Sequence, residues 1–276
     1  EFVSLKSLLA VTNLIFWRIS IMSFVNKREF VTASLLKRLR VGLYQPYKFF
    51  VFAPVLALST AINGTLVMIL LMFLKPRLVS KICGASWARI NSFTTPMRVK
   101  VSGREQVDES QSYVIVSNHQ SHYDIFVLYG WIGIDFKWVM KASLIKIPFL
   151  GPACNKLEHI FIDRSNTQAA LKSINEAKKR IVNGTSVLFF PEGTRSGSGK
   201  MLPFKKGAFK MAMDLNLPLL PVSIVGTEKI LPKGTINLLP GEVEMKIHPP
   251  ISVEGYDSGS MEKLMQETRR VIQSAL

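Results

Sequence analysis

The sequence predicts an α/β domain, with a mixed and largely parallel sheet flanked by helices, behind an N-terminal helical region that associates with a membrane. Two observations lead to this fold class. From residue 94 onward, short apolar runs rich in β-branched residues alternate with segments of helical periodicity. Ahead of them, residues 49–74 form a run of 26 residues without a charge. We therefore divide the chain into a membrane-associating region, residues 1–93, and an α/β domain, residues 94–276.

The composition indicates a folded chain with apolar surface to spare. Of its 276 residues, 48% are hydrophobic and 20% are charged, and the mean hydropathy is +0.23, which excludes intrinsic disorder. The formal net charge of +16 is uneven: residues 1–100 hold 14 Lys and Arg against two acids, and residues 101–276 hold 21 against 17. The excess charge therefore lies beside the most apolar stretch. Because Cys83 and Cys154 lie 71 residues apart, neither a disulfide framework nor a zinc ribbon is predicted.

The uncharged run at residues 49–74 is long enough to cross a membrane. A helix rises about 1.5 Å per residue, so this run reaches about 39 Å, more than the hydrocarbon core of about 30 Å. Basic residues flank both ends, so the positive-inside rule assigns no orientation, and a segment that enters at Pro54 and turns near Asn63-Gly64 fits equally. Residues 8–17 are too short to span and indicate an interfacial helix or a weak first membrane segment. We expect a protein of the inner (cytoplasmic) membrane, with the α/β domain on the cytoplasmic side.

Alternating strands and helices define the second region. The predicted strands are residues 97–103, 113–117, 137–141, 160–163, 186–190, 219–225 and 243–247. The predicted helices are residues 167–183, which Gly184 ends, residues 204–215 and residues 261–275. In sheets of this class the chemistry gathers beyond the strand ends, so the functional residues are sought there.

The most informative strand end is VIVSNHQSHYDIF, residues 114–126. On one continuous helix His119 and Asp124 would be separated by about 140° and could not touch. A strand that ends at Ser117 and a helix that begins near Asp124 allow the loop to fold the imidazole onto the carboxylate. This is the pair of a general base and its orienting acid that acyl transfer uses. The pattern alone is common, and Asp124 as a helix cap beside an ordinary loop histidine is the alternative.

Two more strand ends carry arginine. Residues 189–209 leave a strand and present Glu192, Gly193, Thr194 and Arg195 in a turn, followed by lysines and glycines. A guanidinium binds phosphate bidentately, and glycines let backbone N–H groups approach an anion. Residues 160–166 likewise place Arg164 just past a strand. Either arginine alone would be a solvated surface residue, but both together with the His/Asp pair indicate an anionic substrate.

Four segments in order resemble the signature blocks of the glycerolipid acyltransferases, and most nearly those of the 1-acyl-sn-glycerol-3-phosphate acyltransferases. They are NHQSHYD (118–124), IFIDR (160–164), FPEGTRS (190–196) and LLPVSIVG (219–226). KWVMKASLIKIPFLG (137–151) and LPFKKGAF (202–209) extend the similarity, which covers residues 49–251. Residues 1–45 exceed what the compact bacterial members of the family have.

The resemblance implies transfer of a fatty acyl group from acyl-CoA or acyl carrier protein to the sn-2 hydroxyl of lysophosphatidic acid, which gives phosphatidic acid. The thioester is a co-substrate, and no cofactor or metal is expected. Because a thioester is already activated, a hydroxyl that loses its proton can attack it directly, with His119 as general base and Asp124 as its orienter. The expected partners are membrane lipid, lysophosphatidic acid and the acyl carrier, with no nucleic acid.

By the same resemblance, a set of residues surrounds the acceptor. Arg164 is expected at the acceptor phosphate, and Glu192, Gly193, Thr194 and Arg195 at acceptor binding. Three further candidates are Lys141 or backbone N–H groups near His119 for the thioester oxyanion, Lys206 among the basic residues of its block, and Pro221 as a residue that shapes the pocket.

Other functions remain open. Glycerol-3-phosphate or another lysophospholipid could replace the acceptor, since the catalytic pair would be shared. His119, His122 and Asp124 form HxxHxD, which a metallohydrolase could use, but no further ligands cluster with them in the sequence. There is no GxSxG, and residues 193–201 have the wrong spacing for a phosphate loop. The last alternative is a non-enzymatic basic protein that binds a membrane surface or nucleic acid. Nucleic-acid binding would place aromatic residues between Arg and Lys as stacking platforms, but those near residue 50 lie in the apolar run.

Overall fold

The computed structural model describes residues 39, 41–163, 165–197 and 200–276. The chain divides into two compact units, Glu1–Tyr47 and Lys48–Leu276, and the sheet belongs to the second. The expected interfacial helix at residues 8–17 and the predicted site residue Arg164 lie outside the described residues. The helices between residues 48 and 94 pack within the same unit as the sheet, and the domain boundary at residues 93 and 94 stays a prediction.

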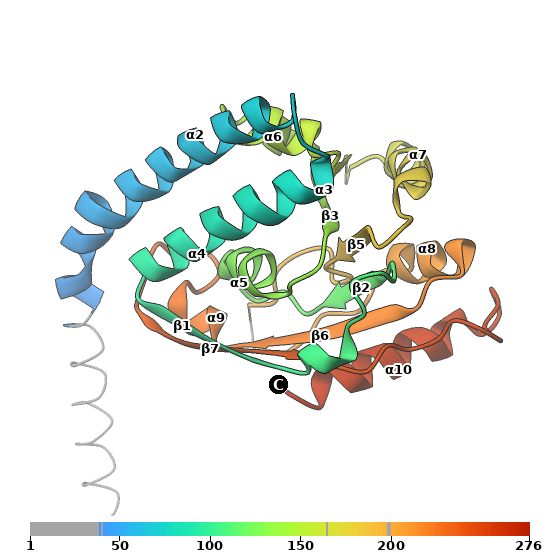
Figure 1. Cartoon of the computed structure of the whole chain (residues 1–276). Helices are drawn as coiled ribbons and strands as arrows, with labels where there is room; N and C mark the ends of the chain where they lie inside the picture. The colour runs from blue at the N-terminus through green and yellow to red at the C-terminus, as the bar shows by residue number, and fades with distance from the viewer. Residues whose placement is uncertain (1–38, 40, 164, 198–199) are drawn as a thin grey trace, which may run out of the picture. The chain divides into compact units, whose positions relative to one another are not determined.

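One sheet of seven strands forms the centre of this unit (Figure 1). Its strands are β1 (Met97–Ser102), β2 (Val114–Ser117), β3 (Phe136–Lys141), β4 (Ile160–Ile162), β5 (Ser186–Phe189), β6 (Leu219–Val225) and β7 (Gly241–Ile247). Their order is β1-β7-β6-β2-β5-β3-β4, and every neighbouring pair is parallel except β6 with β7. The mixed, largely parallel sheet is confirmed, and each strand lies within two residues of its predicted bounds.

The central strands are apolar throughout because helices cover both of their faces. Every residue of β2 and β5 is buried. On β2, Val114 and Val116 face the layer formed by α7 (Thr167–Ala177), α8 (Gly207–Leu215) and α10 (Met261–Gln273). The edge pair β1 and β7 alternates instead: Val243, Met245 and Ile247 are buried between exposed neighbours. The sheet is therefore enclosed on both faces at its central strands, which include β2, the strand that leads to the predicted catalytic loop.

The opposite layer contains α4 (Ala85–Thr94) and α5 (Tyr123–Trp131), with α2 (Ala53–Leu70) packed outside them against α4 and α6 (Leu150–Lys156), as Figure 1 shows. Shorter turns connect these elements: η1 (Lys48–Phe52), α3 (Pro76–Val79), η2 (Ser80–Gly84), η3 (Arg104–Gln106), η4 (Ala142–Lys146), η5 (Lys178–Arg180) and α9 (Thr227–Ile230). The start of α5 at Tyr123 agrees with the helix predicted to begin near Asp124.

The run at residues 49–74 is largely helical, and the alternative turn near Asn63-Gly64 is wrong. Instead, α2 continues through both residues, and Asn63 Nδ2 donates back to the Ser59 carbonyl at 2.9 Å. Gly64 is needed for packing: a Cβ there would lie 2.8 Å from the carbonyl oxygen of Phe149. The glycine therefore permits close approach of α2 to the residue before α6 and does not end the helix.

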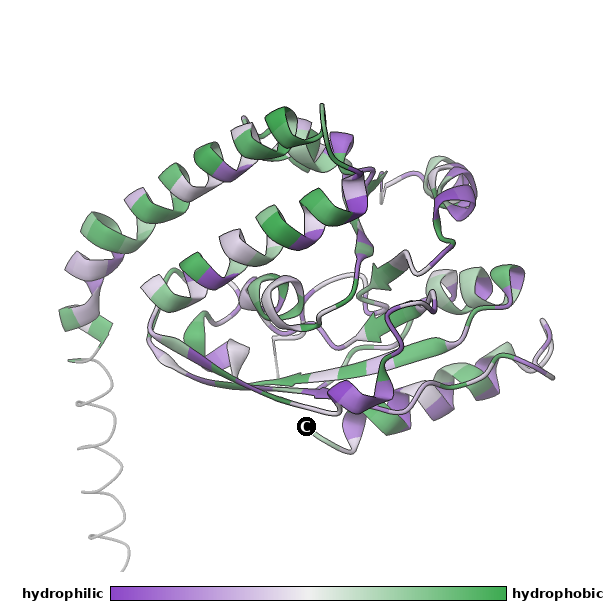
Figure 2. Cartoon of the chain, in the orientation of Figure 1, coloured by the Kyte–Doolittle hydropathy of each residue, from purple (hydrophilic) through white to green (hydrophobic). Residues whose placement is uncertain are grey.

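Among the described residues, one helix is long and apolar enough to cross a membrane, Val41–Leu70. Only 22% of its most apolar window is buried, so it is not an enclosed core helix. Figure 2 shows hydrophobic residues along most of α2, and several of the large ones are exposed, including Leu58 at 62% and Ile62 at 50%. Exposed apolar surface of this extent indicates a contact with lipid or another apolar partner.

The other predicted helices differ at their ends. The helix expected at residues 167–183 ends at Ala177, and a 3₁₀ turn follows it before Gly184. The helices expected at 204–215 and 261–275 are 207–215 and 261–273. No separate helix is predicted at α4 from the sequence, since its buried side includes Asn91 and Ser92 and so lacks an apolar period.

Candidate active site

The loop between β2 and α5 brings His119 and Asp124 together. The Nδ1 atom of His119 lies 2.7 Å from Oδ2 of Asp124. Oδ2 also accepts the backbone N–H groups of Gln120 at 2.7 Å and Ser121 at 2.9 Å. The other carboxylate oxygen, Oδ1, accepts the hydroxyl of Thr227. Asp124 therefore caps the loop ahead of α5 and faces the imidazole at the same time. Because Asp124 is the second residue of α5 and His122 is the N-cap, the alternative of a helix N-cap is wrong.

The imidazole of His119 has one nitrogen left for chemistry. Since Nδ1 faces a carboxylate, we assign the proton of the neutral ring to Nδ1, which leaves Nε2 as an acceptor. Nε2 has no hydrogen-bond partner among the residues that the structure describes, and the ring lines a cavity. The ring stacks on Phe190, with centroids 3.8 Å apart and planes 11° apart. Two restraints therefore hold one ring orientation, as a general base requires.

Glu192 joins the loop of His119 to the turn that follows β5. Its Oε1 accepts the backbone N–H of His119 at 2.8 Å, and its Oε2 accepts that of Leu202 at 2.7 Å. The residue is 3% exposed, and burial raises the pKa of its carboxyl. Both oxygens are thus engaged by the main chain, and Glu192 is absent from the lining of the cavity. The geometry shows a residue that holds the loop, and its acceptor contact stays a prediction.

The rest of the turn presents one cationic residue, Arg195, to the cavity. Thr194 and Arg195 line it, and the carbonyl oxygen of Arg195 accepts a hydrogen bond from Lys233 Nζ at 2.7 Å. Gly193 has φ +71, a left-handed conformation that favours glycine, whereas a Cβ there would meet only the flexible end of Lys205, at 2.8 Å from its Cε. The turn is also bonded to the loop of His119, because Ser196 N–H donates to the His119 carbonyl at 2.7 Å.

The remaining predicted residues differ in whether they line the cavity. Lys141, at the end of β3, lines the cavity. Lys206 precedes α8 on the exposed surface, and Pro221 is buried in β6 beside Val116; neither is among the lining residues. Pro221 therefore supports the strand that carries the catalytic loop, and its expected part in shaping the pocket stays a prediction.

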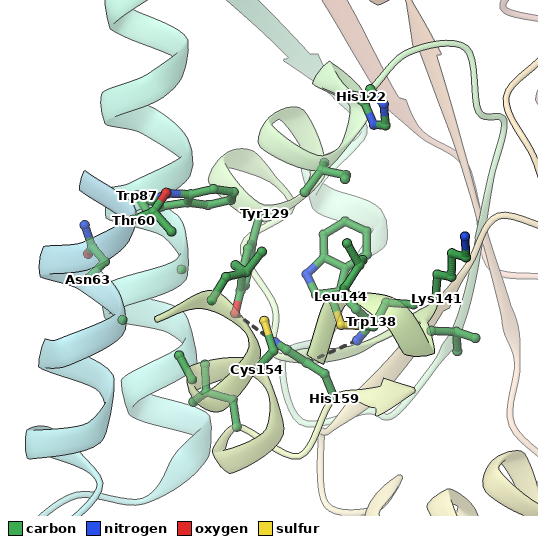
Figure 3. Close-up of a pocket in the computed structure, with 18 of the residues that line it drawn as sticks. Thr60, Asn63, Trp87, His122, Tyr129, Trp138, Lys141, Leu144, Cys154 and His159 are labelled. Carbon is green, nitrogen blue, oxygen red and sulfur yellow. Dashed lines mark hydrogen bonds between the residues drawn. The ribbon is translucent and has the colours of Figure 1, made fainter. Parts of the chain in front are cut away.

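The cavity has a volume of about 620 Å³, within the range of about 300–1,000 Å³ typical of ligand sites. His122 and Lys141 are exposed and mark its open end, whereas Cys154 and His159 are buried at the other, as Figure 3 shows. Between these ends the lining is mainly apolar and comes from α2, η2, α4, α5, β3, η4 and α6; it includes Val67, Trp87, Tyr129, Trp138, Leu144 and Leu150. The site is thus polar at its mouth and apolar along its length.

His122 stands at the mouth beside the base. Burial, followed by the charges of Arg195 and His119, lowers the pKa of this second histidine. Its ring has no hydrogen-bond partner among the described residues. In this part of the chain no group of three His, Cys, Asp or Glu side chains is arranged to hold a metal ion.

The inner end of the cavity is closed by a buried polar network. His159 Nδ1 accepts the backbone N–H of Trp138 at 3.3 Å, so its Nε2 carries the proton and donates to the Tyr129 hydroxyl at 3.3 Å. That hydroxyl also bonds Ser80 Oγ at 3.0 Å. Burial, reinforced by nearby Lys137, lowers the pKa of His159 to about 3. The imidazole is therefore neutral, and its polar atoms are satisfied within the protein.

This buried histidine predicts a loss of stability in acid. In the unfolded chain the imidazole takes up a proton as the pH falls through about 6.5, whereas in the folded chain it stays neutral down to about pH 3. Protonation therefore favours the unfolded chain between these two pH values, so the stability is fully present above about pH 6.5 and is lost as the pH falls. We expect the free energy of unfolding to fall by about 2 kcal/mol more in the wild type than in His159→Asn between about pH 7 and about pH 5. Asparagine keeps an acceptor for Trp138, and urea titrations at both pH values measure the difference. Equal losses in the two proteins would contradict the assignment.

Several site residues escaped the sequence analysis. Thr227 and Ser196 bond the catalytic loop, and Phe190 stacks on its histidine. Phe190 and Ser196 lie inside a recognised block, and Thr227 directly follows one, beyond the carboxyl end of β6. That position was a usable signal, since β6 neighbours β2 in the sheet, but the strand order was not known from the sequence.

An oriented imidazole at the cationic mouth of a long apolar cavity, on a mixed α/β sheet, defines the class of acyl-transfer enzymes that handle lipid substrates. A family model described as Acyltransferase matches residues 98–225. A 1-acyl-sn-glycerol-3-phosphate acyltransferase of Limnanthes alba is 35% identical over 205 residues, which are 73% of this chain and 72% of that protein. The chain belongs to the glycerolipid acyltransferase family.

Two further comparisons set the extent of the likeness. The chloroplastic 1-acyl-sn-glycerol-3-phosphate acyltransferase BAT2 of Brassica napus is 35% identical over 167 residues, 60% of this chain, and the match spans about half of that protein, 48%. The chain is also similar to the crystal structure of the 1-acyl-sn-glycerophosphate (LPA) acyltransferase PlsC from Thermotoga maritima, with a sequence identity of 28% and a TM-score of 0.74. The match covers 87% of this chain and 95% of that one. The protein is therefore an acyltransferase, and its exposed apolar helix associates it with membranes.

Proposed function

We propose that the protein transfers a fatty acyl group from an acyl thioester to the sn-2 hydroxyl of 1-acyl-glycerol-3-phosphate, which gives phosphatidic acid. The observation that carries the proposal is the His119–Asp124 pair at the cationic mouth of the apolar cavity. The names of the relatives support this acceptor, and the geometry supports the reaction type.

In the proposed reaction the acceptor hydroxyl gives its proton to Nε2 of His119 while its oxygen attacks the thioester carbonyl carbon. The carbon–oxygen bond forms, the carbon–sulfur bond breaks, and the thiolate leaves with a proton returned by the imidazolium. Asp124 stabilises that imidazolium through Nδ1, where it lies 2.7 Å away. No covalent acyl-enzyme is needed, because the thioester is already activated. No metal ion or other cofactor takes part.

The apolar length of the cavity suits the donor's fatty acyl chain. Transfer of each methylene from water into such a lining contributes about 0.8 kcal/mol, so a long chain supplies its own binding energy. The reactive carbonyl would then lie at the polar mouth, beside His119. The network of Tyr129 and His159 closes the inner end and would limit the length of chain that fits.

The cationic mouth suits the acceptor phosphate. A planar guanidinium can bind phosphate through two parallel hydrogen bonds, and Arg195 lines the cavity near the base. Lys141 lines the same mouth, where its ammonium could stabilise either the phosphate or the oxyanion of the tetrahedral intermediate. Arg164, outside the described residues, keeps its expected role at the phosphate.

Replacement of Arg195 by lysine is expected to raise the KM for lysophosphatidic acid by on the order of tenfold, because lysine keeps the charge but loses the bidentate geometry. The KM for the acyl thioester should change by less than about twofold. Saturation curves for each substrate measure the two constants, and Arg270→Lys, at an exposed position of α10, is the matched control. A change confined to the thioester constant would count against this placement.

The carrier and the membrane side complete the proposal. Coenzyme A and acyl carrier protein both present an acyl thioester, and both are anionic, as the basic mouth requires. We place the α/β domain on the cytoplasmic side of the inner membrane, with the exposed apolar side chains of α2 in contact with lipid. There the enzyme would meet a membrane-dissolved acceptor and a water-soluble donor.

The test is an assay of the purified full chain in detergent. Acyl-CoA and acyl carrier protein, each with a labelled acyl group, are offered with lysophosphatidic acid, glycerol-3-phosphate, lysophosphatidylcholine and lysophosphatidylinositol in turn. Labelled phosphatidic acid from lysophosphatidic acid alone is the expected result, unaffected by a chelator. Acylation of a different acceptor would replace the proposed substrate, and failure of every pair, despite a folded protein, would overturn the proposal.

A further inference from the structure

The chain that follows β6 wraps the catalytic loop. Gly226 has φ +98, and a Cβ there would lie 2.6 Å from the Glu242 carbonyl, so the chain turns sharply at this glycine. Glu228 accepts the Gly226 N–H at 3.0 Å and fixes the turn. The turn places Thr227, which is fully buried, against Asp124. The protein thus encloses a threonine hydroxyl at the back of its proposed catalytic pair.

The contacts of Asp124 give the hydroxyl a distinct role. Three donors, from His119, Gln120 and Ser121, share Oδ2. Among the residues that the structure describes, Thr227 is the only hydrogen-bond partner of Oδ1. The carboxylate turns about the Cβ–Cγ bond, and this rotation moves both oxygens together. A donor at the second oxygen adds a restraint on the same rotation, so it helps to keep Oδ2 in line with the imidazole.

We propose that Thr227 is a positioning residue of the acyl-transfer reaction: its hydroxyl holds Oδ1 of Asp124 so that Oδ2 keeps His119 in the orientation of a general base. The inference rests on the proposed function and adds a residue to it. Thr227 touches no substrate and acts only through the carboxylate. A buried hydrogen bond to a charged group contributes more than one between neutral groups, and its loss leaves an oxygen unsatisfied.

Two other contacts of the same segment differ in kind. Ser121 Oγ donates to the Leu231 carbonyl at 2.8 Å, and Lys233 donates to the Arg195 carbonyl at 2.7 Å. Each joins a side chain to a main-chain carbonyl, so the two hydrogen bonds hold the segment against the active-site loops without touching the proposed catalytic pair. Thr227 is set apart because its hydrogen bond reaches the carboxylate itself.

The first test compares Thr227→Val, which keeps the shape and removes the hydroxyl, with Thr227→Ser, which keeps the hydroxyl. We expect the valine variant to lose on the order of tenfold to a hundredfold in kcat, with both KM values changed by less than about twofold. The serine variant should stay within about threefold of the wild type. Thr235→Val, an exposed threonine of the same segment whose hydroxyl bonds only within it, is the control. A folded valine variant with normal kcat, a loss confined to KM, or a serine variant as impaired as valine would each overturn the proposal.

The second test asks whether the hydroxyl acts through Asp124. In the Asp124→Asn background, Thr227→Val should cost less than about threefold, because the charge that the hydroxyl orients is gone. If the losses in kcat caused by Thr227→Val and Asp124→Asn simply multiplied in the double variant, Thr227 would not act through Asp124. The double variant also separates positioning from general destabilisation, since a merely structural threonine would cost the same in either background.

A third measurement separates this inference from the proposed function. The proton on His119 Nδ1 is shielded in its hydrogen bond to Asp124, so its NMR signal should exchange slowly with water in the wild type and in Thr227→Ser. In Thr227→Val we expect at least about tenfold faster exchange. This result stands even if no lysolipid is acylated, whereas unchanged exchange in a folded valine variant would refute the positioning role whatever the substrate.

Discussion

Replacement of His119 by alanine is expected to lower turnover by a factor on the order of a thousand or more, which corresponds to at least about 4 kcal/mol of activation free energy. The imidazole is the only acceptor that the described part of the chain orients at the cavity mouth with an acid behind it. Without it, the acceptor hydroxyl must give its proton to water. Substrate binding should persist, because the apolar lining and Arg195 are untouched.

The fold should survive this change. The contacts of His119 with Glu192 and Ser196 are made by its main chain, and alanine keeps them. The stacking on Phe190 is lost, at a cost of about 1 kcal/mol. Circular dichroism and thermal melting check the fold, and initial rates with labelled thioester measure turnover. Near-normal turnover in the folded variant would remove His119 as the base.

His122→Ala provides the comparison within the same loop. Its ring lines the cavity but has no hydrogen-bond partner among the described residues to orient it, so we expect a loss of about tenfold or less. The HxxHxD alternative predicts otherwise, since a metal site would need both histidines. Losses of equal size in His119→Ala and His122→Ala, together with inhibition by a chelator, would favour the metallohydrolase.

Asp124→Asn is expected to lower turnover by on the order of a hundredfold, or about 3 kcal/mol, with the loop intact. The amide oxygen must take the place of Oδ2, because three N–H donors converge there, and the amide nitrogen then faces the hydroxyl of Thr227, which can accept. The imidazole therefore keeps its tautomer and its orientation. What is lost is the negative charge that stabilises the imidazolium, so the effect is smaller than removal of the base.

Asp124→Ala separates charge from structure. Alanine would leave the backbone N–H groups of Gln120 and Ser121 buried without an acceptor, at about 1–3 kcal/mol for each group. This variant should therefore melt at a lower temperature than Asp124→Asn, which should melt close to the wild type. Normal turnover in Asp124→Asn would show that the carboxylate is only a cap.

Much of the fold could be predicted because β-strands leave a local signature. Runs such as VIVS and SVLF are apolar without interruption, as strands covered on both faces must be, and all seven runs became strands. The helices were predicted less well. α4 buries Asn91 and Ser92 against other elements and lacks an apolar period, and the Asn63-Gly64 pair, an ordinary turn signal, is accommodated by packing against Phe149 within a helix.

The residues of the site also differ in how far the sequence reveals them. His119, Asp124 and Arg195 were found because each follows a strand and lies in a recognisable block. Glu192 was found too, but its contacts with the main chain are what show how it acts, since both oxygens are taken by backbone N–H groups. Thr227 was missed because its importance depends on a neighbour 103 positions away in the chain.

By itself the sequence determined the class of fold and the order of the motifs, and it supplied the proposed base and acid, because strand patterning and motif spacing are local properties of the chain. Only the tertiary structure decided that the ends of β2, β5 and β6 lie side by side. This alignment brings Glu192 and Thr227 against the loop between His119 and Asp124. It also formed the apolar cavity, whose walls come from helices and strands remote in sequence. The physical reason is that a cavity and a hydrogen-bond network are sums of long-range contacts, and no periodicity within a segment encodes them.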